Sequence, residues 1–376
     1  KTLYTMKKLL KFAGLILVVA VLSFGVSLWW SQRGTAPEQD TALVGNSLID
    51  RFIAPVSDYF SDQKGSIKLT NEEASFAFLI PSREEVRYYV PRSGEIKSIN
   101  LIKPKEKAKV VTTIKPRAIG ITWSLDGTQL IATYGTDHIT TNLTTGISKT
   151  LDRKITEPKF ATTTDQVAYL YFDSEAKTGA ISIADAQFKD FKNILKTRLK
   201  NWELQWSNER RLSLLATSAE TKLTSLFLLD IAKGELTSVL DSRINLSTNW
   251  SPDGNRLLYS RQTRSGLELY YIDMASNRTV QMKLYSMASK CAWGSDNTTL
   301  YCAIPEKAAK PDDFNGSDDR FVKIDTAHPE KSPETLFTTA DASFVDAREV
   351  LYAPIQQALI FKNFKDGRLY LLSLAK

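Results

Sequence analysis

Two cysteines are the residues whose spacing most directly suggests chemistry. Cys291 and Cys302 stand at the ends of the stretch CAWGSDNTTLYC, in which a polar turn separates two apolar runs. If those runs pair as antiparallel strands, the two cysteines face each other. Directly opposed strand residues have Cα atoms about 4.5–5.5 Å apart, which is within disulfide range. We therefore predict a Cys291–Cys302 disulfide, although a slip in register by one residue would leave two free thiols.

Metal-ligating residues are few in the chain. The two histidines, His138 and His328, lie in unrelated segments, whereas a catalytic metal site needs several converging ligands. The insertion KPDDFNGSDDR gathers acidic residues around one aromatic residue (Asp312, Asp313, Phe314, Asp318 and Asp319). Its spacing does not match an EF-hand loop. We predict no cofactor, no metal and no catalytic residue, and interpret the insertion as a solvated or partner-binding loop, with a calcium loop as an open alternative.

A repeated turn motif indicates the strands and turns that position these residues. In NWSPDGNRLLYS, Trp250 precedes a tight turn in which Pro252 pre-sets φ, Asp253 can bond nearby N–H groups and Gly254 adopts positive φ without strain. Large apolar Trp250 is suited to fill the gap between adjacent sheets. Imperfect copies of the motif contain Trp123 with Asp126 and Gly127, Trp206, and Trp293. Acidic residues that end later strands, Asp230, Asp273 and Asp325, are interpreted as turn formers.

The spacing of the copies predicts the fold. The residues before the turns are Ile80, Trp123, Phe160, Trp206, Trp250, Trp293 and Ala353, at intervals of 43, 37, 46, 44, 43 and 60. Four-stranded propeller blades recur every 40–45 residues or so. The sequence therefore predicts an all-β, seven-bladed propeller over residues 65–376, with six or eight blades as alternatives. The last repeat lacks a fourth strand, so we expect residues 65–70, GSIKLT, to supply it and remove an open edge.

This motif resembles the TolB-type, WD-repeat-like propeller repeat of periplasmic TolB and of prolyl-oligopeptidase-type enzymes. The likeness covers roughly residues 65–376 and is strongest from Trp250 to Gly254. It implies a fold and not a function, since propellers serve many roles. The α/β domain of TolB-like proteins is missing. No G-x-S-x-G elbow occurs either, which removes the reading of an appended hydrolase domain.

The N-terminal part of the chain predicts a membrane anchor. Residues 12–30, FAGLILVVAVLSFGVSLWW, are uncharged and about long enough to cross a bilayer as a helix. Lysines precede the run, so residues 1–11 are expected in the cytoplasm and the propeller outside a cell membrane, bacterial in our interpretation. A cleaved signal peptide is the alternative. Residues 31–64 are interpreted as a linker followed by a helix that packs near the propeller.

The composition argues against one class of function but does not identify the function. The formal net charge is +7, but the charges are mixed with no long basic run, which speaks against nucleic-acid binding. We expect a monomeric, membrane-tethered, non-enzymatic scaffold that binds an envelope protein or peptide. The alternative is a propeller enzyme acting on glycans or peptides through the central channel. Clustered, mutually perturbed carboxylates or basic residues at the channel mouth would favour that alternative.

Overall fold

The computed structural model describes residues 66–306, 316–338 and 345–374. Within these ranges every regular element is a β-strand except two short 3-10 helices, η1 (Pro81–Arg83) and η2 (Ala288–Lys290). The predicted tail, anchor, linker and helix, residues 1–64, lie outside the described residues. None of the helices found in the described ranges is long and apolar enough to span a membrane.

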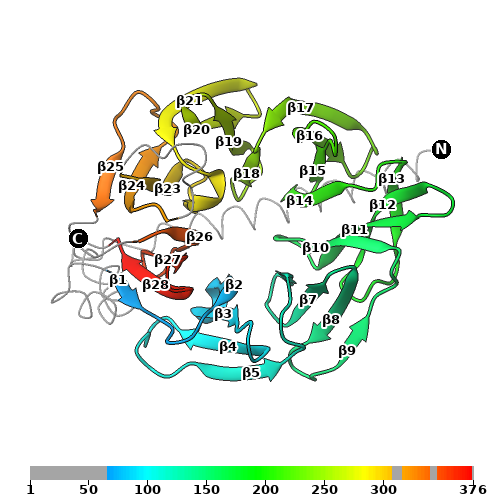
Figure 1. Cartoon of the computed structure of the whole chain (residues 1–376), viewed down its shortest axis with the longest axis horizontal. Helices are drawn as coiled ribbons and strands as arrows, with labels where there is room; N and C mark the ends of the chain where they lie inside the picture. The colour runs from blue at the N-terminus through cyan, green and yellow to red at the C-terminus, as the bar shows by residue number, and fades with distance from the viewer. Residues whose placement is uncertain (1–65, 307–315, 339–344, 375–376) are drawn as a thin grey trace, which may run out of the picture. The chain divides into compact units, whose positions relative to one another are not determined.

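The described residues form seven four-stranded antiparallel sheets arranged as blades around a ring (Figure 1). This confirms the all-β, seven-bladed prediction, and six or eight blades were wrong. In order from the innermost strand outward, the blades are as follows. Blade 1 is β2 (Ser75–Ile80), β3 (Glu85–Tyr89), β4 (Glu95–Asn100) and β5 (Lys109–Thr113); blade 2 is β6 (Gly120–Trp123), β7 (Gln129–Tyr134), β8 (Asp137–Asn142) and β9 (Ser148–Thr150); blade 3 is β10 (Ile155–Phe160), β11 (Gln166–Asp173), β12 (Thr178–Asp185) and β13 (Lys192–Thr197).

The remaining blades follow the same order. Blade 4 is β14 (Trp202–Asn208), β15 (Arg211–Thr217), β16 (Leu223–Asp230) and β17 (Leu236–Ile244); blade 5 is β18 (Ser247–Trp250), β19 (Arg256–Thr263), β20 (Gly266–Asp273) and β21 (Arg278–Tyr285); blade 6 is β22 (Cys291–Trp293), β23 (Thr299–Pro305), β24 (Asp319–Asp325) and β25 (Glu334–Phe337); blade 7 is β26 (Ala347–Ala353), β27 (Ala358–Asn363), β28 (Arg368–Ser373) and β1 (Ser66–Lys68).

Blade 7 closes the ring with a strand from the other end of the described chain. Strand β1 pairs antiparallel with β28, with Ser66 opposite Leu372 and Lys68 opposite Tyr370. The prediction that the segment before the first repeat supplies the missing strand is confirmed. Since β1 covers the edge of β28, blade 7 has as many strands as the other six, and the backbone groups along that side of β28 are paired.

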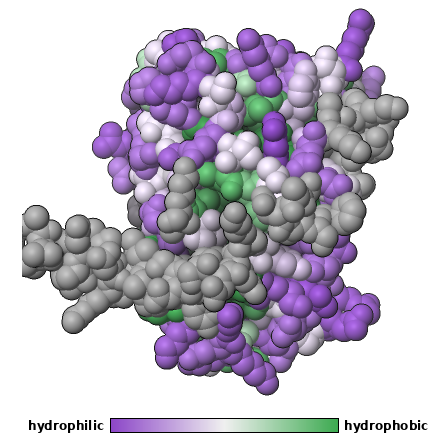
Figure 2. All heavy atoms as spheres, turned by 90° about the vertical axis from the view of Figure 1, so that its left-hand side faces the viewer, coloured by the Kyte–Doolittle hydropathy of each residue, from purple (hydrophilic) through white to green (hydrophobic). Residues whose placement is uncertain are grey.

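Alternation along each strand buries neighbouring residues in two different interfaces. On β7, Leu130 packs with Tyr89 of blade 1, whereas the next residue, Ile131, packs with Phe160 of blade 3. Successive side chains of a strand point to opposite faces of the sheet, so each blade packs against both of its neighbours. The outermost strands are more exposed, and the view from the side of β25 and β1 is mainly hydrophilic, with hydrophobic residues gathered near its middle (Figure 2).

Three of the four repeated tryptophans connect adjacent blades by hydrogen bonds as well as by packing. Trp123 Nε1 donates to the carbonyl of Phe76 at 2.9 Å, and Trp206 Nε1 donates to that of Lys159 at 3.0 Å. Trp293 Nε1 donates to the Asn249 carbonyl at 3.2 Å. Each acceptor belongs to the innermost strand of the preceding blade. These bonds, with the burial of the indoles, hold adjacent blades together.

Candidate functional site

A cavity of about 450 Å³ lies among the innermost strands of blades 2 to 5. Its volume falls in the range of small-ligand sites, about 300–1,000 Å³. Most of the lining is polar, with Lys159 from β10 and Glu203 and Gln205 from β14. Hydroxyl groups come from the neighbouring strands β6 and β18, from the turn after β10 and from η2: Thr122, Ser247, Thr248, Thr162 and Ser289. Apolar side chains, Phe160, Leu204, Trp206, Leu215 and Leu246, complete the wall. A polar cavity at the centre of the ring suits a ligand rich in hydroxyl groups.

Hydrogen bonds hold part of this lining in place. Thr248 Oγ1 on β18 donates to Gln205 Oε1 on β14 at 3.2 Å. The backbone N–H of Phe160 donates to Thr122 Oγ1 on β6 at 3.3 Å. Both bonds run between blades, so the polar groups of the wall are oriented before any ligand arrives, which lowers the entropic cost of binding.

A β-bulge lies in β10 at Glu157, whose carboxylate is near Lys159 of the cavity wall. The pairing of β10 with β11 shifts register between Thr156 and Lys159, which leaves Glu157 and Pro158 unpaired. Glu157 has φ 51°, a left-handed conformation that costs energy for a residue other than glycine. Bulges of this kind re-aim side chains and are common next to active sites. The bulge therefore takes Glu157 out of the alternating pattern of β10.

The other bulged glutamate of the inner strands has a different role. Glu349 on β26 also adopts positive φ, 49°, next to a register shift against β27. Its Oε2 accepts a hydrogen bond of 3.3 Å from the backbone N–H of Ala77 on β2. Glu349 thus ties blade 7 to blade 1, whereas Glu157 forms an ion pair with Lys159 of the cavity wall.

The electrostatic surroundings of Glu157 alter its acidity. Its Oε2 lies 3.7 Å from Lys159 Nζ, and the two side chains are 41% and 39% exposed. Removal from water inside the ring raises the pKa of Glu157 above its usual value; the Lys159 charge opposes this rise and the negative charge of Glu203 adds to it. Two carboxylates and one ammonium group thus influence one another at the cavity. Such a set is able to give and take protons.

This cluster was missed in the sequence, although signals for it exist. In KITEPKF, a proline stands inside a strand and charged residues precede a turn; proline within a strand marks a bulge or an edge. In WELQW, Glu203 and Gln205 alternate with buried residues. Once the innermost strands are known to line a channel, polar residues on them become candidate site residues.

A second hollow, of about 560 Å³, is bordered by turns of blades 4 and 5, including Asn208, Arg210, Asp230 and Asp253. Its acidic residues serve the turns: Asp253 Oδ1 accepts from Ser251 Oγ and from the backbone N–H of Asn255. These bonds lower the pKa of Asp253 although burial opposes them. The carboxyl group with raised pKa, Glu157, lies next to Lys159 of the central cavity wall and does not line this hollow.

The residues of the repeat motif lie at the turns and between blades, and of them Trp206 also lines the central cavity. Asp126 Oδ1 accepts from Ser124 Oγ and the N–H of Thr128, as Asp253 does in its own turn. Gly127 and Gly254 have φ 68° and 65°. Pro252 borders the second hollow. Trp123, Trp206, Trp250 and Trp293 are all buried. These residues build the ring that surrounds the cavity.

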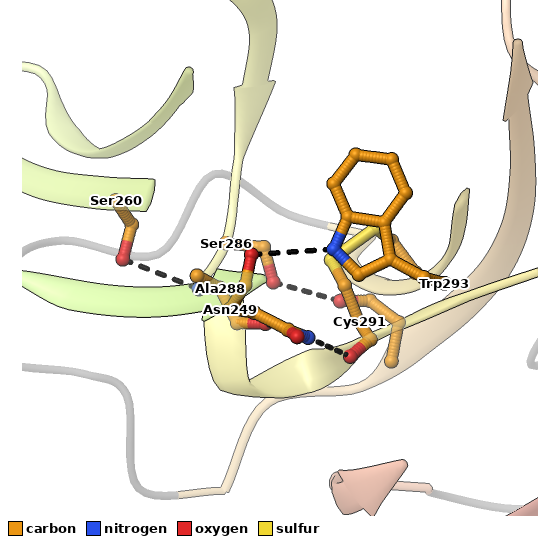
Figure 3. The surroundings of a disulfide bond; sticks show 8 residues. Asn249, Ser260, Ser286, Ala288, Cys291 and Trp293 are labelled. Carbon is orange, nitrogen blue, oxygen red and sulfur yellow. Dashed lines mark hydrogen bonds between the residues drawn. A yellow bond between two sulfur atoms is a disulfide. The ribbon is translucent and has the colours of Figure 1, made fainter. Parts of the chain in front are cut away.

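The two cysteines lie opposite each other on β22 and β23. Their sulfur atoms are 2.13 Å apart in a disulfide with a Cα–Cα distance of 4.1 Å. Asn249 on β18 donates through Nδ2 to the carbonyl of Cys291 at 2.7 Å, and its own carbonyl accepts from Trp293 Nε1 (Figure 3). The disulfide is buried at the contact of blades 5 and 6, so it is a structural element distant from solvent.

The acidic insertion is described only at its end. Asp312, Asp313 and Phe314 lie outside the described residues. Asp318 Oδ1 forms an ion pair of 2.6 Å with Lys365 Nζ. Asp319 is fully buried and contacts Lys290. The two therefore contribute to structure at the contact of blades 6 and 7.

The histidines do not meet. His138 is buried with Nδ1 3.0 Å from Thr133 Oγ1, and burial, then the charge of Lys159, lowers its pKa. His328 is exposed and pairs with Asp325 Oδ2 at 2.7 Å. Over residues 66–306, 316–338 and 345–374, no three His, Cys, Asp or Glu side chains are grouped so as to hold a metal ion.

Comparison with known proteins shows the fold and no family. No protein-family model and no curated protein matches the sequence. Among solved structures, an oligogalacturonate lyase from Vibrio parahaemolyticus matches with a TM-score of 0.58 at 11% identity over 84% of this chain and 95% of that one. An oligogalacturonate lyase in complex with manganese matches with 0.54 at 12% identity over 84% and 98%. The β-propeller domain of Swd1 from Myceliophteria thermophila matches with 0.53 at 11% over 84% and 99%.

Two of these three structures are enzymes, which contradicts our expectation of a non-enzymatic, protein- or peptide-binding scaffold and favours its alternative, a propeller enzyme. Identities of 11% and 12% show the fold alone, so the activity of this chain is argued from its own residues. The manganese of the second lyase does not fit the described donor set, because no suitable group of three ligands is present in those residues.

Proposed function

We propose that this chain is an enzyme that cleaves glycosidic bonds in the central cavity, with Glu157 as general acid and Glu203 as general base. The observation that carries the proposal is the position of Glu157 3.7 Å from Lys159, in a cavity wall that also contains Glu203; partial burial and the charge of Glu203 raise the pKa of Glu157. Glycoside cleavage commonly uses two carboxyl groups, one as general acid and one as general base or nucleophile.

Each residue of the cluster has its own role in the proposed reaction. Glu157, which retains its proton to higher pH than a free glutamate, donates it to the glycosidic oxygen as the bond to the leaving sugar breaks. Glu203 removes a proton from the attacking water. Lys159, 3.7 Å from Glu157, stabilises the Glu157 carboxylate that forms after proton transfer. The hydroxyl and amide groups of Thr122, Gln205 and Thr248 are placed to bind sugar hydroxyls.

A glycan is the substrate class because the lining is rich in hydroxyl and amide groups. The oligogalacturonate lyases show that a ring of this fold can act on a glycan, which supports the proposal without deciding it. A lyase would use the same acid and base, with the base removing a proton from carbon instead of water. The products distinguish the two reactions.

The cellular setting is part of the proposal and comes from the sequence. Residues 12–30 would anchor the chain in a cell membrane and hold a TolB-type propeller on the outer side. A buried disulfide between Cys291 and Cys302 supports an oxidising compartment, where such bonds persist. An anchored enzyme of this kind would act as a monomer on glycans near the membrane surface, without a nucleic-acid partner.

The test is cleavage of a panel of soluble polysaccharides and oligosaccharides by the full chain purified in detergent. We expect new reducing ends with at least one glycan, and a decrease of roughly 10²–10⁴-fold in rate for Glu157→Gln. Glu235→Gln is the matched control, because Glu235 is 70% exposed and remote from the cavity lining. An unsaturated, ultraviolet-absorbing product end would assign elimination instead of hydrolysis. Equal rates for Glu157→Gln and wild type would refute the assigned acid.

A further inference from the structure

Three charged side chains are fully buried where blades 6 and 7 meet. Lys290 ends η2, Asp319 begins β24, and Asp346 immediately precedes β26. Their side chains are 1%, 0% and 0% exposed. Lys290 Nζ lies 2.8 Å from Asp319 Oδ2, 2.8 Å from Asp346 Oδ1 and 2.8 Å from Ser317 Oγ. No residue proposed for glycan cleavage belongs to this cluster.

The two carboxyl groups of the cluster are unequal. Asp319 Oδ1 is buried and has no hydrogen-bond partner. Burial raises the pKa of Asp319, against the opposing effect of Lys290. For Asp346, burial acts in the same direction, but Lys290, Arg348 and the N–H of Gly316 outweigh it and lower its pKa. An unpartnered oxygen in a buried carboxylate is costly, so Asp319 is the less stable of the two anions.

We propose that Lys290 and Asp319 condense in the folded chain to form an intramolecular isopeptide bond between Nζ and Cγ. The fold holds the amine against the carboxyl group, which supplies the proximity that such a reaction lacks in solution. The same closeness holds for an ordinary ion pair such as Lys154–Asp173; the Lys290–Asp319 pair differs from it in its complete burial and in the Asp319 oxygen without a hydrogen-bond partner.

The step balances without an oxidant or a second reactant. The Lys290 ammonium passes a proton to Asp346, and the resulting amine attacks Cγ of Asp319. Oδ2, held by the backbone N–H of Ala347 at 2.8 Å, carries the developing negative charge and becomes the amide oxygen. Oδ1 leaves as water with two of the three ammonium protons, transferred through Asp346. One N–C bond forms, one C–O bond breaks, and the third proton stays on the amide nitrogen.

Formation of the amide removes the buried charges and the unpaired oxygen of the ion pair. One positive and one negative charge disappear from a site without solvent, and the oxygen that lacked a partner departs. Asp346 keeps its neighbour Arg348, whose Nη2 lies 3.5 Å from Asp346 Oδ2. The net charge of the cluster is therefore unchanged, while two of its buried charges are replaced by a neutral amide.

The test is peptide mapping by mass spectrometry of the full chain, denatured and reduced before digestion with trypsin. We expect a branched peptide joining the Lys290 segment to the Asp319 segment, lighter than the sum of its two parts by one water, and loss of cleavage after Lys290. The exposed pair Lys154–Asp173, with Nζ and Oδ2 2.7 Å apart and side chains 46% and 30% exposed, is the control in the same digest and should give separate peptides.

Variants separate the roles within the cluster. Lys290→Arg and Asp346→Asn should both abolish the branched peptide, the first by removing the nucleophile and the second by removing the proton carrier. Circular dichroism of each variant checks that the strands still form. If a variant fails to fold, the wild-type digest alone decides. Separate Lys290 and Asp319 peptides from wild type after prolonged incubation would overturn the proposal and leave an ion pair. This result is independent of glycan cleavage.

Discussion

Replacing Gly254 by alanine tests the way in which the repeat motif joins one blade to the next. Gly254 has φ 65°, and a Cβ added there would lie 2.3 Å from the carbonyl oxygen of Ser207 on the adjacent blade. Gly135 offers a matched control with φ 64° and no atom within 4 Å of the added Cβ. The two substitutions share the cost of the left-handed conformation and differ in the clash.

The expected magnitudes follow from these two terms. Gly135→Ala should lower the free energy of unfolding by roughly 1–2 kcal/mol, the cost of a left-handed conformation. Gly254→Ala should lower the free energy of unfolding by about 1–3 kcal/mol more than Gly135→Ala does, because a backbone atom must move to relieve the overlap. Urea unfolding of the full chain, followed by tryptophan fluorescence, measures both. Equal midpoints for the two variants would refute the claim that this glycine is required by the contact between blades.

Three further predictions concern the tryptophans, the disulfide and the candidate acid. Trp206→Phe removes a hydrogen bond to a partly buried carbonyl and should lower the free energy of unfolding by about 0.5–1.5 kcal/mol more than Trp250→Phe, whose Nε1 has no partner; urea midpoints compare the two, and equal losses would contradict the role of the bond. Replacing both Cys291 and Cys302 by alanine should lower the free energy of unfolding by about 2–3 kcal/mol; an unchanged thermal midpoint would argue against a stabilising role. Because Glu157 must carry a proton to act, and its pKa is raised, the cleavage rate should fall as pH rises through that pKa; a rate that rises there would assign the acid elsewhere.

Much of the fold follows from the sequence because turns and burial are local properties. Trp250 to Gly254 encode a strand end and a tight turn within five residues, and the repeat of that pattern gave the blade count. Three repeats have another residue in place of the tryptophan. In these repeats too, the residue at that position ends an innermost strand, as the spacing predicts: Ile80, Phe160 and Ala353. The pairing of β1 with β28 followed from counting strands in the last repeat.

The candidate site could not be predicted in the same way, since it depends on residues from different blades. Glu157 and Glu203 are 46 positions apart and influence each other only because β10 and β14 are both innermost strands. The bulge at Glu157 shifts the register of β10 by one residue and so changes the direction of a side chain. The alternation of polar and apolar residues in the sequence does not reveal such a shift. The cluster of Lys290, Asp319 and Asp346 likewise forms only when two blades meet.

The most direct measurement of where the chemistry takes place is hydrogen–deuterium exchange of the full-length Glu157→Gln variant, with and without a glycan that the wild type cleaves. The variant binds the glycan but consumes it slowly. We predict slower exchange in β10, residues Ile155–Phe160, and in β14, residues Trp202–Asn208. Protection confined to the outermost strands, or no protection at a saturating glycan concentration, would contradict a reaction in the central cavity.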